Sequence, residues 1–264
     1  MKKFGIKLWS KDFIKNKDFA TQSINAVKDG YFDYVELFAL PNSYDNLHNI
    51  VKSEMKNIQT IIHAPHSCFD LDTGNSELLR QNQEKLKSSQ QFADLLNANI
   101  IILHPGFYEE EKFLEESIRQ FKIFNDNRIA VENMPSYCSS TNKPLHGSSP
   151  TQISRFITET NCKFCLDFSH AICAANGYKR DIFNDLHEYQ KLNPCMYHMC
   201  DGNWDSDNDE HLHYGQGNYP LDTLINDYTN DDTHITMETG SGLPSSIAPW
   251  IDDIKYIKAI LMTK

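Results

Sequence analysis

The sequence lacks any apolar run close to the ~20 residues that a membrane-spanning helix requires. Its first residues, MKKFGIKLWSKDF, are basic at the start but contain neither a long apolar segment nor a small-residue cleavage site. The seven cysteines are an odd number and show no regular disulfide spacing, which favours reduced thiols. We therefore expect a cytoplasmic protein rather than a membrane protein or a disulfide-stabilised secreted domain.

The chain also has little positive charge. Lys and Arg number 25 against 36 Asp and Glu, which gives a formal net charge of −11. This balance disfavours a protein that is basic overall, although a local positive groove could still bind nucleic acid. Hydrophobic residues make up 40% of the 264 residues and include 15 Phe, 12 Tyr and three Trp. This content is enough for a large globular core.

Eight short apolar runs alternate with helical patterns along the chain. The runs are FGIKLW, YVELF, TIIH, NIIILH, RIAVE, KFCLD, CMYH and HITME. The clearest helix is expected over residues 76–95, after Asn75 as its cap, and others over 18–28, 110–124, 151–158, 181–192, 221–228 and 248–262. This alternation predicts a parallel sheet, and eight units close into a single (β/α)8 TIM barrel of the α/β class. No linker or repeat divides the chain, so we expect one domain over residues 1–264.

Six of these runs end in side chains that bind metals, namely His63, His104, Glu132, Asp167, His198 and Glu238. Three further candidates follow two of the runs, namely His170 in DFSH and the pair Asp209 and His211 in DEH. A lone His or Glu at a strand end is more often an ordinary hydrogen-bonded group. The carboxyl ends of barrel strands share one face, however, and nine independent coincidences on that face are improbable. The sequence therefore predicts a metal site with too many ligands for one ion.

The composition of this set indicates both the metal and its chemistry. His and carboxylate ligands without thiolate suit Zn²⁺, Mn²⁺ or Fe²⁺. Carboxylates can bridge two ions that activate water for the hydrolysis of phosphate esters. His66 and His213 remain open as additional ligands, outer groups or substrate contacts. Cys200 is a weak candidate for an outer ligand, and GQGN at 215–218 is interpreted as a tight turn that directs His211 into the site.

The motifs HAPH, LHPG, VEN, LDFSHA, YHMCDG, DEHLHYGQGN and MET, in this order, resemble the signature stretches of endonuclease IV. That family lies within the xylose isomerase-like barrel superfamily, and the resemblance covers most of the chain. It implies a phosphoesterase with three zinc ions, and the same nine residues as ligands. The implied ligand sets are His63, His104 and Glu132 for the first ion, Glu132, Asp167, His198 and Glu238 for the second, and His170, Asp209 and His211 for the third.

The loops with which endonuclease IV grips DNA are not matched. VELFALPNSYD replaces the stretch of basic and aromatic residues that the family carries after the second strand, and HAPHSCFDL lacks the Tyr expected after the third. The stretch 201–209, DGNWDSDND, has four Asp where the family has Lys and Arg, and it would repel a phosphate backbone unless metal ions neutralise it. We therefore expect a small sugar or sugar-phosphate substrate, with abasic DNA as a less favoured partner.

A second interpretation follows from GYFDYVELFALP, which is more like the sugar isomerases and epimerases of the superfamily. That resemblance implies one divalent ion, with Mn²⁺ as the alternative to two or three Zn²⁺, held by Glu132, Asp167, His198 and Glu238. Glu132 and Glu238 would then act as a general acid/base pair beside a carbonyl group. A barrel that binds metal or sugar without turnover is the third possibility that the sequence leaves open.

Overall fold

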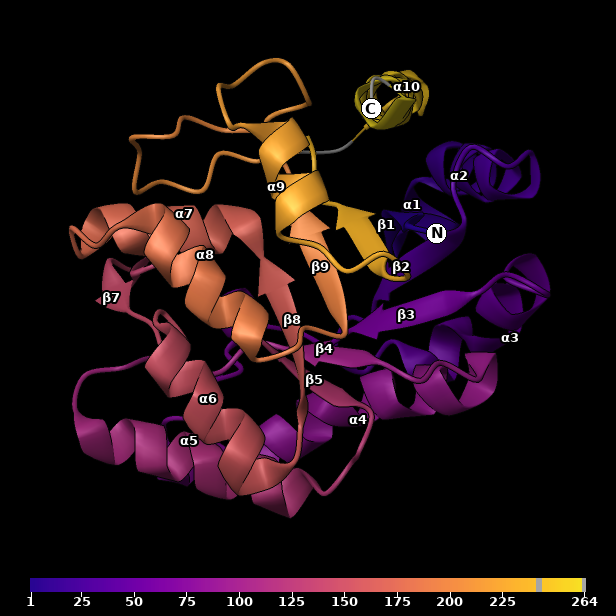
Figure 1. Cartoon of the computed structure of the whole chain (residues 1–264). Helices are drawn as coiled ribbons and strands as arrows, with labels where there is room; N and C mark the ends of the chain where they lie inside the picture. The colour runs from indigo at the N-terminus through magenta and orange to yellow at the C-terminus, as the bar shows by residue number, and fades with distance from the viewer. Residues whose placement is uncertain (241–243, 263–264) are drawn as a thin grey trace.

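A closed barrel of eight parallel strands forms the centre of the computed structural model, which describes residues 1–240 and 244–262 (Figure 1). The strands follow one another around the barrel in chain order, and β1 pairs with both β2 and β10. They are β1 (Lys3–Trp9), β2 (Tyr34–Phe38), β3 (Thr60–His63), β4 (Ile101–Leu103), β5 (Ile129–Glu132), β8 (Lys163–Asp167), β9 (Met196–Met199) and β10 (His234–Met237). The predicted (β/α)8 barrel is confirmed.

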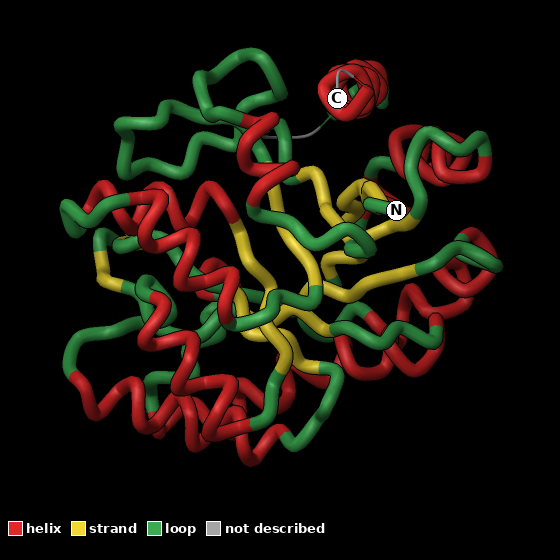
Figure 2. The backbone as a smooth tube through the Cα atoms, in the orientation of Figure 1, coloured by secondary structure: helices red, strands yellow, loops and turns green. Residues whose placement is uncertain are grey.

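Helices form an outer layer around the strands (Figure 2). They are α1 (Asp12–Lys15), α2 (Lys17–Lys28), α3 (Tyr44–Glu54), α4 (Leu79–Leu96), α5 (Glu111–Phe124), α6 (Pro150–Thr160), α7 (Phe168–Gly177), α8 (Ile182–Lys191), α9 (Leu221–Asp227) and α10 (Ala248–Met262). A hairpin of β6 (Tyr137–Cys138) and β7 (Lys143–Pro144) lies in the loop after β5, and the short turns η1 (Ser67–Phe69) and η2 (Ser76–Leu78) precede α4. Within the described part of the chain, no helix combines the length and apolar character needed to cross a bilayer.

The sequence did not predict α1, α3 or α7. Eight of the ten residues of α7 are buried, so its sequence FSHAICAANG has no polar face from which an amphipathic period could be recognised. Asp167, the last residue of β8, caps this helix by accepting a hydrogen bond from the backbone N–H of His170 at 2.6 Å. The chain therefore passes from strand to helix without a loop, and His170 is held in the first turn beside the barrel mouth.

The barrel interior is filled by an apolar layer that includes Tyr34, Ile61, Ile102 and Cys165. Tyr34 packs over Gly5 of the neighbouring strand, where a Cβ atom would lie 2.3 Å from the ring. The ring is fully buried and its hydroxyl shares a 2.8 Å hydrogen bond with Thr236, so it has little freedom to move away.

We expect Gly5→Ala to lower the free energy of unfolding by about 3 kcal/mol, because the added methyl group overpacks a rigid interior. Urea denaturation followed by circular dichroism measures this change. Ser53→Ala, at an exposed position of α3, is the control and should change stability by less than about 0.5 kcal/mol. An equally small effect of Gly5→Ala would contradict the tight packing of Tyr34.

Candidate metal centre

The nine side chains singled out in the sequence lie together at the carboxyl ends of the barrel strands. His63, Glu132 and Asp167 are the last residues of β3, β5 and β8, and His104 and Glu238 directly follow β4 and β10. Ligand atoms lie within 4.8 Å of one another in several groups. Three groups share members, namely His63, His104 and Glu132, then Glu132, Asp167 and His170, then Glu36, His63, His198 and Glu238. A further group of Cys200, Asp209 and His211 is joined to them by the 3.3 Å contact between Asp209 and His170. The strand-end pattern thus identified side chains that the fold brings into one continuous cluster.

Glu132 occupies the middle of this cluster and is fully buried. Its Oε2 lies 2.9 Å from Nε2 of His104 and 3.5 Å from Nε2 of His63, and its Oε1 lies 3.1 Å from Nδ1 of His198. Burial opposes its charge, but the His198 and His104 rings hold the pKa of Glu132 well below its usual range. An ionised carboxylate with one oxygen toward each side of the cluster is suited to bridge two cations.

Three buried atoms in the cluster have no hydrogen-bond partner among the described residues, namely Oε1 of Glu36, Oε2 of Glu132 and Nε2 of His104. The last two face each other at 2.9 Å. Burial lowers the pKa of His104 to about 4, so its imidazole is neutral at neutral pH. Buried polar atoms are normally satisfied, and a cation bound by the neutral ring and the carboxylate would satisfy both. The residues present therefore fit a metal ion.

Three histidine rings of the cluster are fixed in the same way. The Nδ1–H groups of His63, His170 and His211 donate to the backbone carbonyl oxygens of Ala64, Asn133 and Glu238, at 2.7, 2.9 and 2.7 Å respectively. The opposite nitrogen, Nε2, then faces a carboxylate of the cluster in each case. A backbone acceptor on one nitrogen that leaves the other free is the usual arrangement of metal-binding histidines.

Asp167 and His198 form the deeper part of the cluster together with Glu238. Nδ1 of His198 lies 3.0 Å from Oε1 of Glu238 and 3.9 Å from Oδ2 of Asp167. Burial raises the pKa of Asp167 to about 7, so this carboxyl is half-protonated near neutral pH when no cation is bound. Although burial opposes it, the surrounding Cys165, Glu238, Glu36 and Glu132 raise the pKa of His198 well above its ordinary value. The metal-free site therefore holds protons where cations would bind.

Asp209 lies between two histidines at the outer side of the cluster. Its Oδ2 is 3.3 Å from Nε2 of His170 and 2.6 Å from Nε2 of His211. Burial opposes a charge on His211, but Asp209 raises its pKa to about 9. The Sγ atom of Cys200 forms a close group with ligand atoms of Asp209 and His211, all within 4.8 Å of one another, and Cys200 stays a candidate for an outer ligand.

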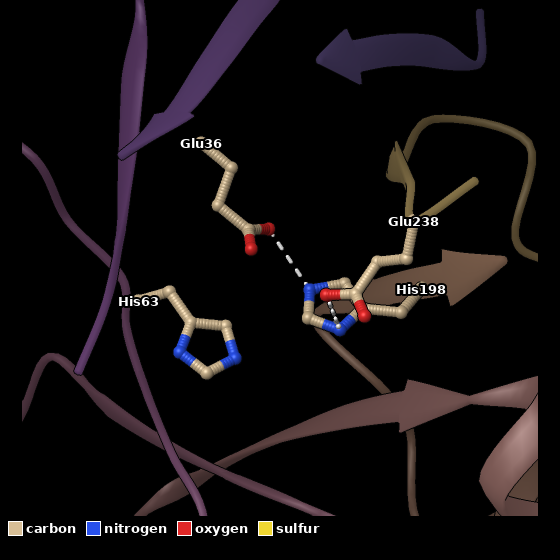
Figure 3. Close-up of side chains that lie close together, drawn as sticks. All are labelled: Glu36, His63, His198 and Glu238. Carbon is tan, nitrogen blue, oxygen red and sulfur yellow. Dashed lines mark hydrogen bonds and ion pairs between the residues drawn. The ribbon is translucent and has the colours of Figure 1, made fainter. Parts of the chain in front are cut away.

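Two charged residues of this site were missed by the sequence interpretation. Lys7 of β1 forms ion pairs with Glu238 and with Oε1 of Glu36, the latter at 3.3 Å. Glu36 of β2 is fully buried, and its Oε2 lies 2.9 Å from Nε2 of His198 (Figure 3). The available signal was a charged residue inside each of the apolar runs FGIKLW and YVELF.

His66 and His213, whose role as ligands the sequence did not decide, belong to none of the groups of ligand atoms found among the described residues. His66 stacks on His104 with ring centroids 5.1 Å apart, and burial lowers its pKa well below the ordinary value. Nδ1 of His213 donates to Asp253 at 2.7 Å. His66 therefore borders the cluster, whereas His213 has a carboxylate partner of its own.

The acidic stretch 201–209 has a more varied role than its composition suggested. Asp201 is buried and accepts hydrogen bonds from the backbone N–H groups of Gly215, Gly217 and Tyr219, so it anchors the GQGN turn. Asp209 belongs to the cluster, which leaves Asp205 and Asp207 exposed. The negative charge presented to solvent by this loop is therefore smaller than the sequence indicated.

Comparisons with known proteins place this geometry in a family. The model of the family described as xylose isomerase-like TIM barrel matches residues 24–260. A probable endonuclease 4 from Halothermothrix orenii is 24% identical over 219 residues, which cover 72% of this chain and 74% of that protein. The crystal structure of a D-tagatose 3-epimerase-like protein matches with a TM-score of 0.74 and 19% identity. The match covers 99% of this chain and 97% of the chain of that protein. Endonuclease IV from Thermus thermophilus has a TM-score of 0.64 and 16% identity, over 99% of this chain and all of that one. The chain belongs to the xylose isomerase-like TIM barrel family.

Proposed function

We propose that the protein is a metal-dependent hydrolase of a sugar-linked phosphate ester and holds two to three zinc ions at the carboxyl end of the barrel. The observation that carries this proposal is the shared orientation of three histidine rings, those of His63, His170 and His211. In each, Nδ1 is hydrogen-bonded to a backbone carbonyl oxygen, and Nε2 faces the carboxylate of Glu132 or Asp209. Such a set of imidazoles and carboxylates without an obligatory thiolate suits zinc. The similarity to probable endonuclease 4 supports the same class of reaction.

We assign the nine side chains to three ligand sets, two of which share Glu132. His63, His104 and Glu132, which lie in one close group, would hold the first ion. Glu132, Asp167, His198 and Glu238 would hold the second, and His170, Asp209 and His211 the third. Ions bound in this way supply an activated water and charge stabilisation for phosphoryl transfer. Glu132 keeps two sets in contact, and the ammonium group of Lys7 adds a fixed positive charge beside Glu238.

The surroundings of the cluster favour a small substrate over duplex DNA. Phe38 stacks on His63 at 5.0 Å and on Trp9 at 4.5 Å, and Phe69 lies 5.6 Å from Phe38. Phe38 is buried, so the partly exposed rings of Trp9 and Phe69 form the aromatic border of the first ligand set. Aromatic rings of this kind pack against the apolar faces of sugars or bases. Exposed Asp205 and Asp207 lie in the loop after β9 and disfavour a long phosphate backbone.

An assay of the zinc-loaded protein on pentose and hexose phosphates, with an abasic duplex in parallel, tests this function. We expect zinc-dependent release of phosphate from a sugar phosphate, faster than cleavage of the duplex. Endonuclease IV on the same duplex is the positive control. Similar cleavage of the duplex by both proteins would make DNA the substrate, and no release from any ester would contradict the hydrolase.

A sugar isomerase or epimerase is the second candidate. It is favoured by the fold similarity to a D-tagatose 3-epimerase-like protein and by Glu132 and Glu238, which approach the same ring nitrogen of His198 at 3.1 and 3.0 Å. An isomerase would need only one ion, for which Mn²⁺ is the alternative to zinc. In heavy water, such an enzyme would introduce solvent deuterium into the recovered sugar. The third possibility is a barrel that binds metal or sugar without turnover. A Glu238→Gln variant that keeps its metal but loses turnover would argue against it.

A further inference from the structure

Glu36 contacts His198 at Nε2, whereas Glu132, Asp167 and Glu238 face the other ring nitrogen, Nδ1. Figure 3 shows the Glu36 carboxylate at one ring nitrogen and Glu238 at the other. Nε2–H of His198 donates to Oε2 of Glu36 at 2.9 Å, whereas Nδ1 faces Glu132 and Glu238. Two nitrogens of one imidazole point in divergent directions and cannot serve the same ion. Glu36 is therefore not a further ligand of the ion at Nδ1.

The Glu36 carboxylate is itself firmly anchored. The hydroxyl of Thr236 donates to Oε2 at 2.6 Å, and the hydroxyl of Tyr34 is hydrogen-bonded to Thr236 at 2.8 Å. All three side chains are fully buried and lie on β2 and β10, which flank β1. This chain of hydrogen bonds fixes the acceptor before any cation is bound.

The group Glu36, His63, His198 and Glu238 has the composition of a fourth metal site, but Lys7 already supplies a cation there. Its Nζ is paired with Glu238 and lies 3.3 Å from Oε1 of Glu36. A metal ion between the same two carboxylates would be repelled by this ammonium group at short range. Lys7 thus balances the charge of Glu36, and no ion is required at this position.

We propose that Glu36 is a positioning residue of the metal centre. It holds the ring of His198 so that Nδ1 points toward Glu132, Asp167 and Glu238, and Lys7 balances the charge of the Glu36 carboxylate. This inference rests on the proposed function. A carboxylate partner on the remote nitrogen of a metal-binding histidine fixes its orientation and strengthens the ligand, and loss of such partners typically weakens metal binding by about 10- to 100-fold. Only the second ion, which uses His198, should be affected.

Zinc affinities measured by competition with a coloured chelator test this role, with Co²⁺ absorption spectra as the second readout. We expect Glu36→Ala to weaken one ion by about 100-fold and Glu36→Gln, which keeps an acceptor oxygen, by about 10-fold. The visible Co²⁺ bands of one site should shift while those of the others remain. Asp185→Asn is the matched control, because Asp185 is a buried carboxylate that pairs with Arg180 at 2.7 Å outside the cluster, and all its zinc affinities should equal those of the wild type.

The outcomes separate this inference from the proposed function. Wild-type protein that binds no zinc would overturn both. Wild-type protein with two or three ions, together with Glu36→Ala that binds each of them equally well, would overturn only the role of Glu36. If Glu36→Ala does not fold, the zinc-loaded wild type answers the question by ¹⁵N–¹H spectroscopy of its histidine rings. A protonated Nε2 on His198 is expected, and a protonated Nδ1 would overturn the proposal.

Discussion

Glu132→Gln is expected to remove two zinc ions at once and to reduce phosphate-ester hydrolysis on the order of 1,000-fold or more. The two carboxylate oxygens of Glu132 face opposite sides of the cluster, toward His104 at 2.9 Å and His198 at 3.1 Å. Glutamine keeps one acceptor oxygen and places an uncharged NH₂ group at the other position, which cannot bind a cation. Both the first and the second ligand set would lose their shared anion.

Elemental analysis by mass spectrometry measures this effect as moles of metal per chain. We expect two to three zinc ions in the wild type and at most one in Glu132→Gln, with any remaining ion held by His170, Asp209 and His211. Asp185→Asn should keep the full complement, since its carboxylate pairs with Arg180 outside the cluster. An unchanged zinc content in Glu132→Gln would contradict the bridging role. About one manganese ion in the wild type would move the isomerase to first place.

The strand-end histidines and carboxylates were predictable because parallel strands bring their carboxyl ends to one face of a barrel. That rule needs only the order of residues, and it located His63, Glu132 and Asp167 at the last positions of their strands. It did not reach Glu36, which lies two residues before the end of β2 and pairs with Ile61 rather than with His63. The stagger of strands in a closed barrel determines which interior position reaches the site, and the stagger is not readable from one strand alone.

Burial on both faces also hid the direction of individual side chains. All five residues of β2 are buried, so YVELF shows no alternation from which an inward side chain could be identified. The same holds for α7, where His170 was found only through its DFSH motif and not through a helical period. Lys7 and Glu36 required the three-dimensional pairing of β1 with β2, which sets these two residues opposite each other.

Zinc should bind to the first ligand set at lower pH than to the third. Burial lowers the pKa of His104 to about 4, so this ligand is already neutral above about pH 5. Against the effect of burial, Asp209 raises the pKa of His211 to about 9, so a metal ion must displace a proton from that ring at neutral pH. For each proton displaced, the apparent affinity of the third ion should rise about tenfold per pH unit between pH 6 and 9.

Chelator competition at pH 6, 7 and 8, with titration calorimetry in two buffers of different ionisation enthalpy, measures this dependence and counts the protons released. The stability of the metal-free protein should depend on pH in the opposite direction. A raised pKa of His211 adds stability that is complete below its unfolded value of about 6.5 and is lost as the pH rises through about 9. Heating scans should therefore show the metal-free protein losing stability over this range while zinc-loaded protein gains it, because the ion replaces the proton shared by Asp209 and His211. Parallel pH dependence of all bound ions would contradict the assignment of His211 to the third set.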